Sequence, residues 1–310
     1  MKHEVRRAVE ILRRGGLVAF PTETVYGLGA DAANAPAVAK LYAVKRRPAE
    51  HPVIVHFDSA PRAFTWARDV PDAARELARK FWPGPLTLIL RRSPLAQDFV
   101  TGGQDNIGVR VPRHPVAHEL LAEFGGGIAA PSANRFGRVS PTTAAHVRED
   151  LGGDVDVVLE GGPSDVGIES TIVDLSGAKP MLLRPGRISS ADIAAVIGPV
   201  AEKGAAAPRH SGGLERHYAP RTPARLVATH ELDREIAKLD DKVAVLAFSR
   251  PDERVAYWLR MPRDAHAYEH KLYGALRELD GARCEAILIE APPPTGEWVA
   301  VLDRLKRACG

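Results

Sequence analysis

The sequence predicts an α/β protein of two domains, and three observations lead to this fold class. Short apolar runs of strand length alternate with amphipathic stretches of helix length. A length of 310 residues exceeds what one core usually takes. Residues 201–224 are rich in Ala, Gly, Pro and Arg without apolar periodicity, which is typical of a linker. We expect a first domain over 1–200, a linker or lid over 201–224 and an accessory domain over 225–310.

The first domain is predicted to begin with an amphipathic helix whose inward face holds Val5, Ala8, Val9 and Leu12. A strand at 17–20 stops at Pro21, because proline cannot donate to a strand ladder, and an irregular turn is expected through Gly29. Further helices are expected at 36–45, 71–80, 116–124, 144–151 and 190–197, and strands at 53–57, 86–90, 107–111, 128–130, 155–159, 170–174 and 181–183. Since this order is not a strict alternation, the sheet is expected to be mixed.

A second pattern of the same kind follows the linker. Strands are expected at 225–228, 243–248, 255–258 and 286–290, and helices at 230–239, 265–279 and 298–308. This order predicts a small Rossmann-like α/β unit that lacks the glycine fingerprint of a dinucleotide site.

Composition narrows the class of partner and the compartment. A net charge of +3, with 45% hydrophobic and 26% charged residues, describes a globular protein without the overall charge of a nucleic-acid binder. Cys284 and Cys309 are too few for a disulfide framework and fit a reducing cytoplasm. No apolar run reaches the roughly 20 residues of a membrane span. A cytoplasmic location with no membrane partner is therefore expected.

Several familiar site motifs are missing from the sequence. There is no P-loop, and Gly27-Leu28-Gly29 lacks the third glycine of a dinucleotide loop. His114 and His118 are four residues apart, but without an H-E pattern a surface pair is favoured and no metal site is predicted. Both cysteines lie far from the polar loops, so no covalent catalyst is expected.

Cations and hydroxyls instead follow the ends of predicted strands. Thr22, Glu23, Thr24 and Tyr26 come after the first strand and indicate either a ligand loop or a polar loop with ordinary turn glycines. Arg110 lies on a strand otherwise made of valines. An arginine in such a place usually has a paired anion, either a protein carboxylate or a ligand.

Further polar residues occur at similar places, and each also has a structural explanation. Lys45-Arg46-Arg47 closes a predicted helix, where basic side chains often only complement the helix dipole. Ser140 is predicted to cap the next helix, a role that competes with ligand binding. Ser170 and Arg184 add another hydroxyl and another strand-end cation. Their coincidence at strand ends favours a ligand site.

Nine short motifs in order resemble one enzyme family. They are P-T-E-T-V-Y-G-L-G, K-x-R, I-V-H, W-P-G-P-L-T, V-R-V-P, P-S-A-N-x-F-G, S-P-T, E-S-T-I-V-D and L-R-P-G. This set is similar to the YrdC-type threonylcarbamoyl-AMP synthases. The tail resembles their longer form, in which a linker ending in H-Y-A-P leads to a second domain. The resemblance covers nearly the whole chain.

The resemblance implies a fold, a reaction and partners. The fold would be a YrdC-like twisted mixed sheet with helices around a basic cleft, followed by the Rossmann-like domain. L-threonine, bicarbonate and ATP, with Mg²⁺, would give threonylcarbamoyl-AMP and pyrophosphate. Other proteins would then use the product to modify the adenosine beside the anticodon of certain tRNAs, and a weak contact with tRNA is left open.

The resemblance also implies residue roles. Lys45 and Arg47 would be the catalytic cations, and Tyr218 would close a lid from the linker. The implied threonine-binding residues are Thr24, His56, Arg110, Ala130 and Ser170. The implied ATP-binding residues are Arg47, His51, Asn106, Ser132, Asn134, Ser140, Arg184 and Tyr218. Glu23 has no implied substrate contact and is predicted to orient Arg110 or another cation.

Three positions depart from the family pattern. His51 stands where asparagine is common and Asn106 where threonine or serine is usual, and both still form hydrogen bonds. The segment H-S-G-G-L, residues 210–214, replaces a motif that carries S-P-G, and the lost proline is expected to loosen the linker.

Two alternative functions are less consistent with the sequence than a threonylcarbamoyl-AMP synthase. A carbamoyltransferase of the hydrogenase-maturation type would carry zinc-finger cysteine pairs and an acylphosphatase-like region, and this chain has neither. A non-catalytic binder of double-stranded RNA or tRNA would need a broad basic face. Here single cations are interleaved with small hydroxyl residues, as in a small-molecule pocket.

Overall fold

The computed structural model describes residues 2–204, 207–239 and 242–310, and its contacts divide the chain into two compact units. The first unit holds Met1–Phe136, Pro141–Asp165 and Glu169–Gly213, and the second holds Gly137–Ser140, Val166–Ile168 and Leu214–Gly310. Residues 205 and 206 of the predicted linker lie outside the described residues.

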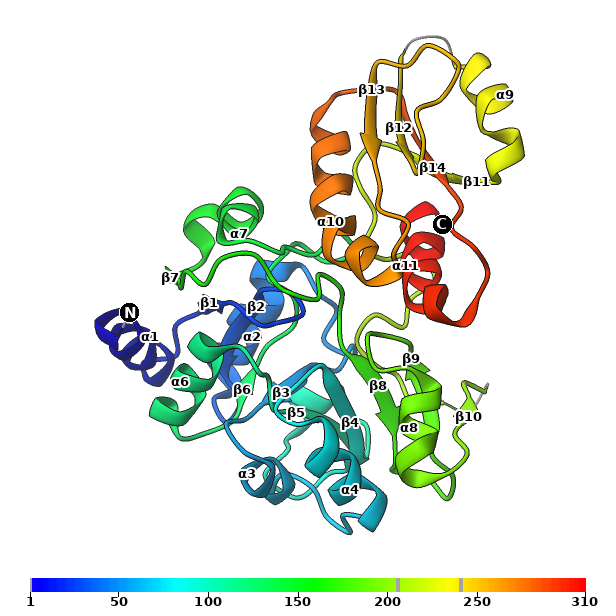
Figure 1. The fold of residues 1–310 in the computed structure, drawn as a ribbon. Helices are drawn as coiled ribbons and strands as arrows, with labels where there is room; N and C mark the ends of the chain where they lie inside the picture. The colour runs from blue at the N-terminus through cyan, green and yellow to red at the C-terminus, as the bar shows by residue number, and fades with distance from the viewer. Residues whose placement is uncertain (1, 205–206, 240–241) are drawn as a thin grey trace. The chain divides into compact units, whose positions relative to one another are not determined.

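A mixed sheet runs through the first unit (Figure 1). Its strands are β1 (Val18–Phe20), β2 (Gly27–Asp31), β3 (Ile54–His56), β4 (Leu86–Arg91), β5 (Asn106–Arg110), β6 (Ile128–Ala129), β7 (Val157–Val158), β8 (Thr171–Asp174), β9 (Met181–Arg184) and β10 (Ala201–Glu202). They lie in the order β10-β9-β8-β4-β5-β3-β6-β2-β1-β7. Because β3 pairs with β5 in parallel while β4 pairs with β5 antiparallel, the predicted mixed sheet is confirmed.

Helices bury the apolar faces of this sheet. They are α1 (Lys2–Arg13), α2 (Ala35–Lys45), α3 (Ala60–Thr65), α4 (Asp72–Phe81), α5 (Asp98–Thr101), α6 (Pro115–Phe124), α7 (Ala144–Leu151) and α8 (Ser190–Ile197). The inward residues predicted for α1 are all buried and share one core cluster with α6. The short helices α3 and α5 were not predicted from the sequence, because one to two turns carry too little periodicity to detect.

The predicted irregular turn is shorter than expected, since Gly27–Asp31 forms β2 rather than continuing it. β2 pairs with β1 and β6, and its glycines let these strands approach closely. A Cβ at Gly29 would lie 2.9 Å from both Ile128 Cγ2 and Phe20 Cε1. These glycines therefore serve close backbone approach between strands.

The N-cap of α7 also differs from the prediction. Thr143, rather than Ser140, precedes the helix and accepts the N–H of His146 at 3.2 Å. Ser140 is fully buried and belongs to the second unit. The sequence S-P-T-T offers three hydroxyl residues, and the cap is the one that directly precedes the first helical residue.

The second unit is built on a parallel sheet with the order β11-β14-β12-β13. Its strands are β11 (Ala224–Val227), β12 (Val243–Ala247), β13 (Tyr257–Arg260) and β14 (Ala286–Glu290). Its helices are α9 (Leu232–Ala237), α10 (Ala265–Gly281) and α11 (Val299–Cys309). A parallel sheet with crossover helices agrees with the Rossmann-like expectation.

Candidate active site

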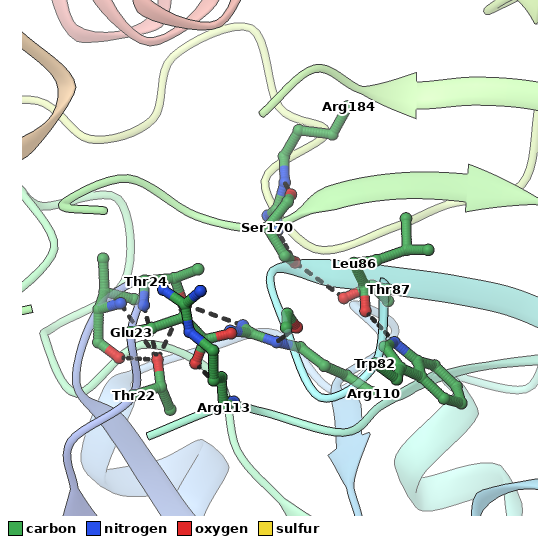
Figure 2. Close-up of polar contacts among 12 residues, drawn as sticks. Thr22, Glu23, Thr24, Trp82, Leu86, Thr87, Arg110, Arg113, Ser170 and Arg184 are labelled. Carbon is green, nitrogen blue, oxygen red and sulfur yellow. Dashed lines mark hydrogen bonds and ion pairs between the residues drawn. The ribbon is translucent and has the colours of Figure 1, made fainter. Parts of the chain in front are cut away.

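The turn between β1 and β2 is held by Thr22. Its Oγ1 hydroxyl donates to the Val25 carbonyl at 2.6 Å and accepts the N–H groups of Thr24 and Val25, each at 3.2 Å. A hydroxyl that bonds its own backbone in this way fixes the turn locally. Glu23 and Thr24 are thereby directed toward the end of β5, as Figure 2 shows.

Arg110, the last residue of β5, is the centre of this network (Figure 2). Its guanidinium donates to Glu23 Oε1 at 2.7 Å, Thr24 Oγ1 at 2.9 Å and the Gly84 carbonyl at 3.2 Å. The second carboxylate oxygen of Glu23 accepts the backbone N–H of Arg113 at 3.1 Å. Arg110 is 4% and Glu23 1% exposed, so the ion pair is buried. The paired anion of Arg110 is therefore a protein carboxylate, and Glu23 orients Arg110.

Two N–H groups of the Arg110 guanidinium have no hydrogen-bond partner among the described residues. A guanidinium has five N–H groups, and the three contacts with Glu23, Thr24 and Gly84 use three of them. Such a pair of fixed N–H groups, in a site screened from water, suits an anion with two oxygens.

His56 lies beside Arg110, since the two residues are register partners on β3 and β5. Burial and the Arg110 charge lower the pKa of His56 to about 3, so the imidazole is neutral near pH 7. Its Nδ1 atom is buried and has no hydrogen-bond partner among the described residues. Ala130 follows β6 close by, with its N–H bonded to the Ile54 carbonyl at 3.0 Å. The structure thus brings four of the predicted threonine residues, Thr24, His56, Arg110 and Ala130, onto the neighbouring elements β3, β5, β6 and the β1–β2 turn.

The pKa of His56 predicts a pH dependence of stability. Below pH 6.5 the unfolded chain binds a proton at His56, whereas the folded chain does so only near pH 3. The free energy of unfolding should therefore fall by up to about 1.4 kcal/mol per pH unit as pH drops through this window. His56→Gln should lack this contribution. Urea unfolding of the wild type and of His56→Gln at pH 7, 6, 5 and 4 measures this difference in the free energy of unfolding. Parallel pH profiles for the two proteins would refute the prediction.

Ser170 and Arg184 form a second group of contacts (Figure 2). Arg184 donates to the Ser170 carbonyl at 2.9 Å and to Ser170 Oγ at 3.1 Å. Ser170 Oγ also lies 2.8 Å from the Thr87 hydroxyl on β4. A third Arg184 donor reaches the Ser211 carbonyl at 3.0 Å. Thr87 and Ser211 were not singled out in the sequence, although each lies within a quoted segment, W-P-G-P-L-T and H-S-G-G-L.

Lys45 is the last residue of α2, and its buried ammonium group bonds the turn after β6. Nζ lies 2.5 Å from the carbonyls of Ser132 and Asn134 and 3.5 Å from Asn134 Oδ1. The Ser132 hydroxyl in turn donates to Asn134 Oδ1 at 2.5 Å. Burial, with a contribution from Arg47, lowers the pKa of Lys45 well below its usual value. The predicted K-x-R and S-x-N pairs are therefore one cluster, in which Lys45 fixes the Ser132 turn.

Arg47 extends this cluster toward β3. Arg46, the C-cap that follows α2, is in the left-handed conformation, with φ of 56°, which turns the next residue back toward the chain before β3. Arg47 donates to the carbonyls of His51 at 3.2 Å and Pro52 at 2.7 Å, and its guanidinium lies 5.2 Å from the Phe136 ring centre. Burial and the Arg47 charge lower the pKa of His51.

Ser211 lies between the two arginines of the predicted ATP set. Its hydroxyl donates to the Pro52 carbonyl at 3.1 Å, the same oxygen that Arg47 bonds, while its own carbonyl accepts from Arg184. Nearby, Arg209 N donates to Gln104 Oε1 at 2.8 Å. The described part of the predicted linker that precedes residue 214 thus packs on the first unit rather than standing apart from it.

The other three residues predicted to bind ATP lie on different elements from the ATP residues described above. Asn106 begins β5, at the opposite end of that strand from Arg110, beside Arg91 in the register. Ser140 and Tyr218 belong to the second unit. There Tyr218 is 1% exposed, and the Arg304 guanidinium lies 5.4 Å from its ring centre.

The described residues contain no group of three or more His, Cys, Asp or Glu side chains arranged to hold a metal ion. Among the same residues, no helix combines the length and apolar character needed to cross a bilayer.

Comparison with known proteins identifies relatives over the whole chain. Residues 10–186 match a family model described as "Telomere recombination", and residues 188–310 match "Threonylcarbamoyl-AMP synthase, C-terminal domain". The threonylcarbamoyl-AMP synthase of Pyrococcus abyssi is 38% identical, with 99% of this chain and 94% of that protein covered. The synthase of Bacillus subtilis is also 38% identical, with coverage of 99% and 93%.

A solved structure also matches this chain over its whole length. P. abyssi Sua5 complexed with L-threonine is 36% identical, superposes with a TM-score of 0.94, and is covered over 95% of its length by 100% of this chain. The matches define an α/β enzyme of the nucleotidyltransferase class. More particularly, the chain belongs to the threonylcarbamoyl-AMP synthase family, in the form with a second, C-terminal domain.

Proposed function

We propose that this enzyme condenses L-threonine, bicarbonate and ATP to L-threonylcarbamoyl-AMP, with release of pyrophosphate and water. The buried Arg110, aligned by Glu23 and Thr24 with two N–H groups left over, is the observation that carries the proposal. The L-threonine complex of P. abyssi Sua5, whose fold matches this chain, supports L-threonine as the substrate.

Arg110 would bind the threonine carboxylate through its two remaining N–H groups. Neutral His56, with its unpartnered Nδ1, would offer a hydrogen bond to a polar group of the same ligand. The hydroxyls of Thr24 and Ser170 and the backbone at Ala130 would complete the pocket. A fixed cation at one end of threonine would leave its amine free to add to bicarbonate.

Catalysis in this scheme is mainly positioning. The threonine amine attacks the carbon of bicarbonate to form a carbamate, with loss of water, and a carbamate oxygen then attacks the α-phosphorus of ATP and displaces pyrophosphate. Carbamates decompose readily, so holding the reactants in line is the main contribution of the enzyme. No protein nucleophile is required.

The polyphosphate would be neutralised by Arg47 and Arg184, which flank Ser211. Lys45 would act with them through the Ser132–Asn134 turn that it holds, and His51, Asn106, Ser140 and Tyr218 would complete the ATP contacts. The carboxylate of Glu23 is already committed to Arg110 and Arg113. Mg²⁺ would enter as part of the MgATP substrate, where it would neutralise phosphate charge.

We further propose that the enzyme works in the cytoplasm and passes its product to proteins that modify the adenosine beside the anticodon of certain tRNAs. A mixed carbamic–phosphoric anhydride is reactive toward water, so a downstream transferase must consume it soon after release.

One assay tests the reaction. The full-length protein is incubated with ATP, bicarbonate and labelled threonine, and both pyrophosphate and a threonine-containing adenylate are measured. Both products should appear together and should vanish when threonine or bicarbonate is omitted. Pyrophosphate release that ignores threonine would overturn the proposal, as would binding of tRNA without any turnover.

A further inference from the structure

The second unit contains an open pocket that the proposed reaction does not use. It lies where the carboxyl end of β13 meets the first half of α10 and has a volume of about 710 Å³. Four of its lining residues, Arg260, Arg263, His270 and Lys271, are basic, and Met261 and Ala267 are among the apolar ones. This volume is in the range of small-molecule sites.

The two arginines and the lysine of the pocket form no ion pair with a described residue. Arg263 donates to Ser249 Oγ at 2.9 Å, and Lys271 to the Arg260 carbonyl at 2.6 Å. The nearby carboxylate of Asp264 accepts the Ala267 N–H at 2.8 Å as the cap of α10. The positive charge of the pocket therefore remains available to an anion.

Arg263 is positioned rather than loose. Its guanidinium lies 5.5 Å from the centre of the Phe248 ring, which adds a cation–π contact to the bond with Ser249. Lys271 lies one turn along α10 from Ala267, on the same face of the helix. The small side chain of Ala267 therefore leaves room in the pocket between Arg263 and Lys271.

Ligands of open parallel sheets usually bind at the carboxyl ends of the central strands, and in this unit aromatic side chains fill that position. At the carboxyl ends of β12 and β14, the rings of Phe248, Tyr268 and Trp298 pack at 5.4–5.8 Å between centres, with Trp298 edge to face against the other two. Glu290, at the end of β14, accepts the Phe248 N–H at 2.8 Å. A nucleotide cannot enter a space that these side chains fill, whereas the pocket one strand further, beside β13, is open.

We propose that this pocket binds a small phosphate ester, with its phosphate oxygens on Arg260, Arg263 and Lys271 and its apolar part against Met261 and Ala267. An extended RNA backbone is disfavoured because exposed acidic side chains would repel it, namely Glu278 on α10 and Asp252 and Glu253 in the segment that precedes β13.

Hydrogen exchange on the full-length protein, with pyrophosphate and AMP as separate probes at 150 mM salt, tests the site. Peptides that cover residues 257–275 should gain at least about threefold protection, and the double variant R263Q/K271Q should lose it. The matched control is R234Q/K238Q, which removes the same charges from exposed positions, Arg234 on α9 and Lys238 at its C-cap, and should keep the protection. Threonine-dependent pyrophosphate release should be unchanged in both variants.

Each remaining outcome is decisive. Absence of protection in 257–275 at millimolar probe would overturn the site, and so would equal loss in the control variant, which would indicate only long-range charge. Protection by a short oligoribonucleotide but by neither small probe would replace the proposal with an RNA contact. Because the exchange signal is local to the second unit, failure of the catalytic proposal would leave this test unaffected.

Discussion

Arg110→Ala is expected to abolish threonine-dependent pyrophosphate release at ordinary threonine concentrations. The variant removes the one cation that Glu23 and Thr24 align at the end of β5. Hydrogen bonds to charged groups contribute about 1.5–3 kcal/mol each, so loss of a two-point contact should raise KM for threonine by about a hundredfold or more. Initial rates over a threonine series, with ATP saturating, measure this.

The same variant should also be less stable. It leaves the Glu23 carboxylate, which is 1% exposed, without its ion-pair partner. Breaking one side of a buried pair costs about 3–5 kcal/mol, because the remaining charge stays desolvated. Arg113→Ala is the matched control, because Arg113 is exposed and bonds Glu23 only through its backbone N–H. This variant should keep both the wild-type KM for threonine and the wild-type stability.

A double variant separates the two effects. Arg110→Met with Glu23→Leu replaces the buried pair by apolar groups and should recover most of the stability. Threonine dependence should remain lost, since the ligand cation is still missing. An unchanged KM for threonine in either Arg110 variant would remove the role proposed for this residue.

Structure that depends on residues near one another in the sequence was the most predictable part of this molecule. Alternation of apolar runs indicated both sheets, and Pro21 marked the end of β1. The exception was β2, where Gly27 and Gly29 resembled a turn. The reason for Gly29 lies about a hundred residues away, in the Ile128 side chain of β6, which with Phe20 leaves no room for a Cβ.

The site was predictable in its residue types but not in its pairings. Strand-end cations and hydroxyls indicated a ligand site, and Glu23 was predicted to orient Arg110 or another cation, but no local pattern selects Arg110, 87 positions later, over the other cations. The same holds for Ser211, whose contacts with Pro52 and Arg184 depend on how β3 and β9 are placed in the sheet. Such contacts follow from tertiary packing and are invisible to periodicity.

Glu23→Gln is expected to weaken threonine binding without removing the Arg110 charge. The carboxylate accepts hydrogen bonds at both oxygens, from Arg110 Nη2 at 2.7 Å and from the Arg113 N–H at 3.1 Å. A glutamine has the same shape but only one acceptor oxygen, so its NH₂ group must face one of these two donors. Either arrangement lets the guanidinium turn away from its fixed direction.

Because Glu23 acts through Arg110 rather than on the reacting atoms, the change should appear in KM for threonine, by about tenfold or more, with a much smaller change in kcat. Glu160→Gln offers the matched control, since Glu160 forms an exposed ion pair with Arg148 at 2.6 Å and the same isosteric change there should leave KM unaltered. A merely structural Glu23 would instead lower stability and leave KM for threonine where it was. Equal losses in kcat and in kcat/KM would place Glu23 at the reacting centre and contradict the positioning role.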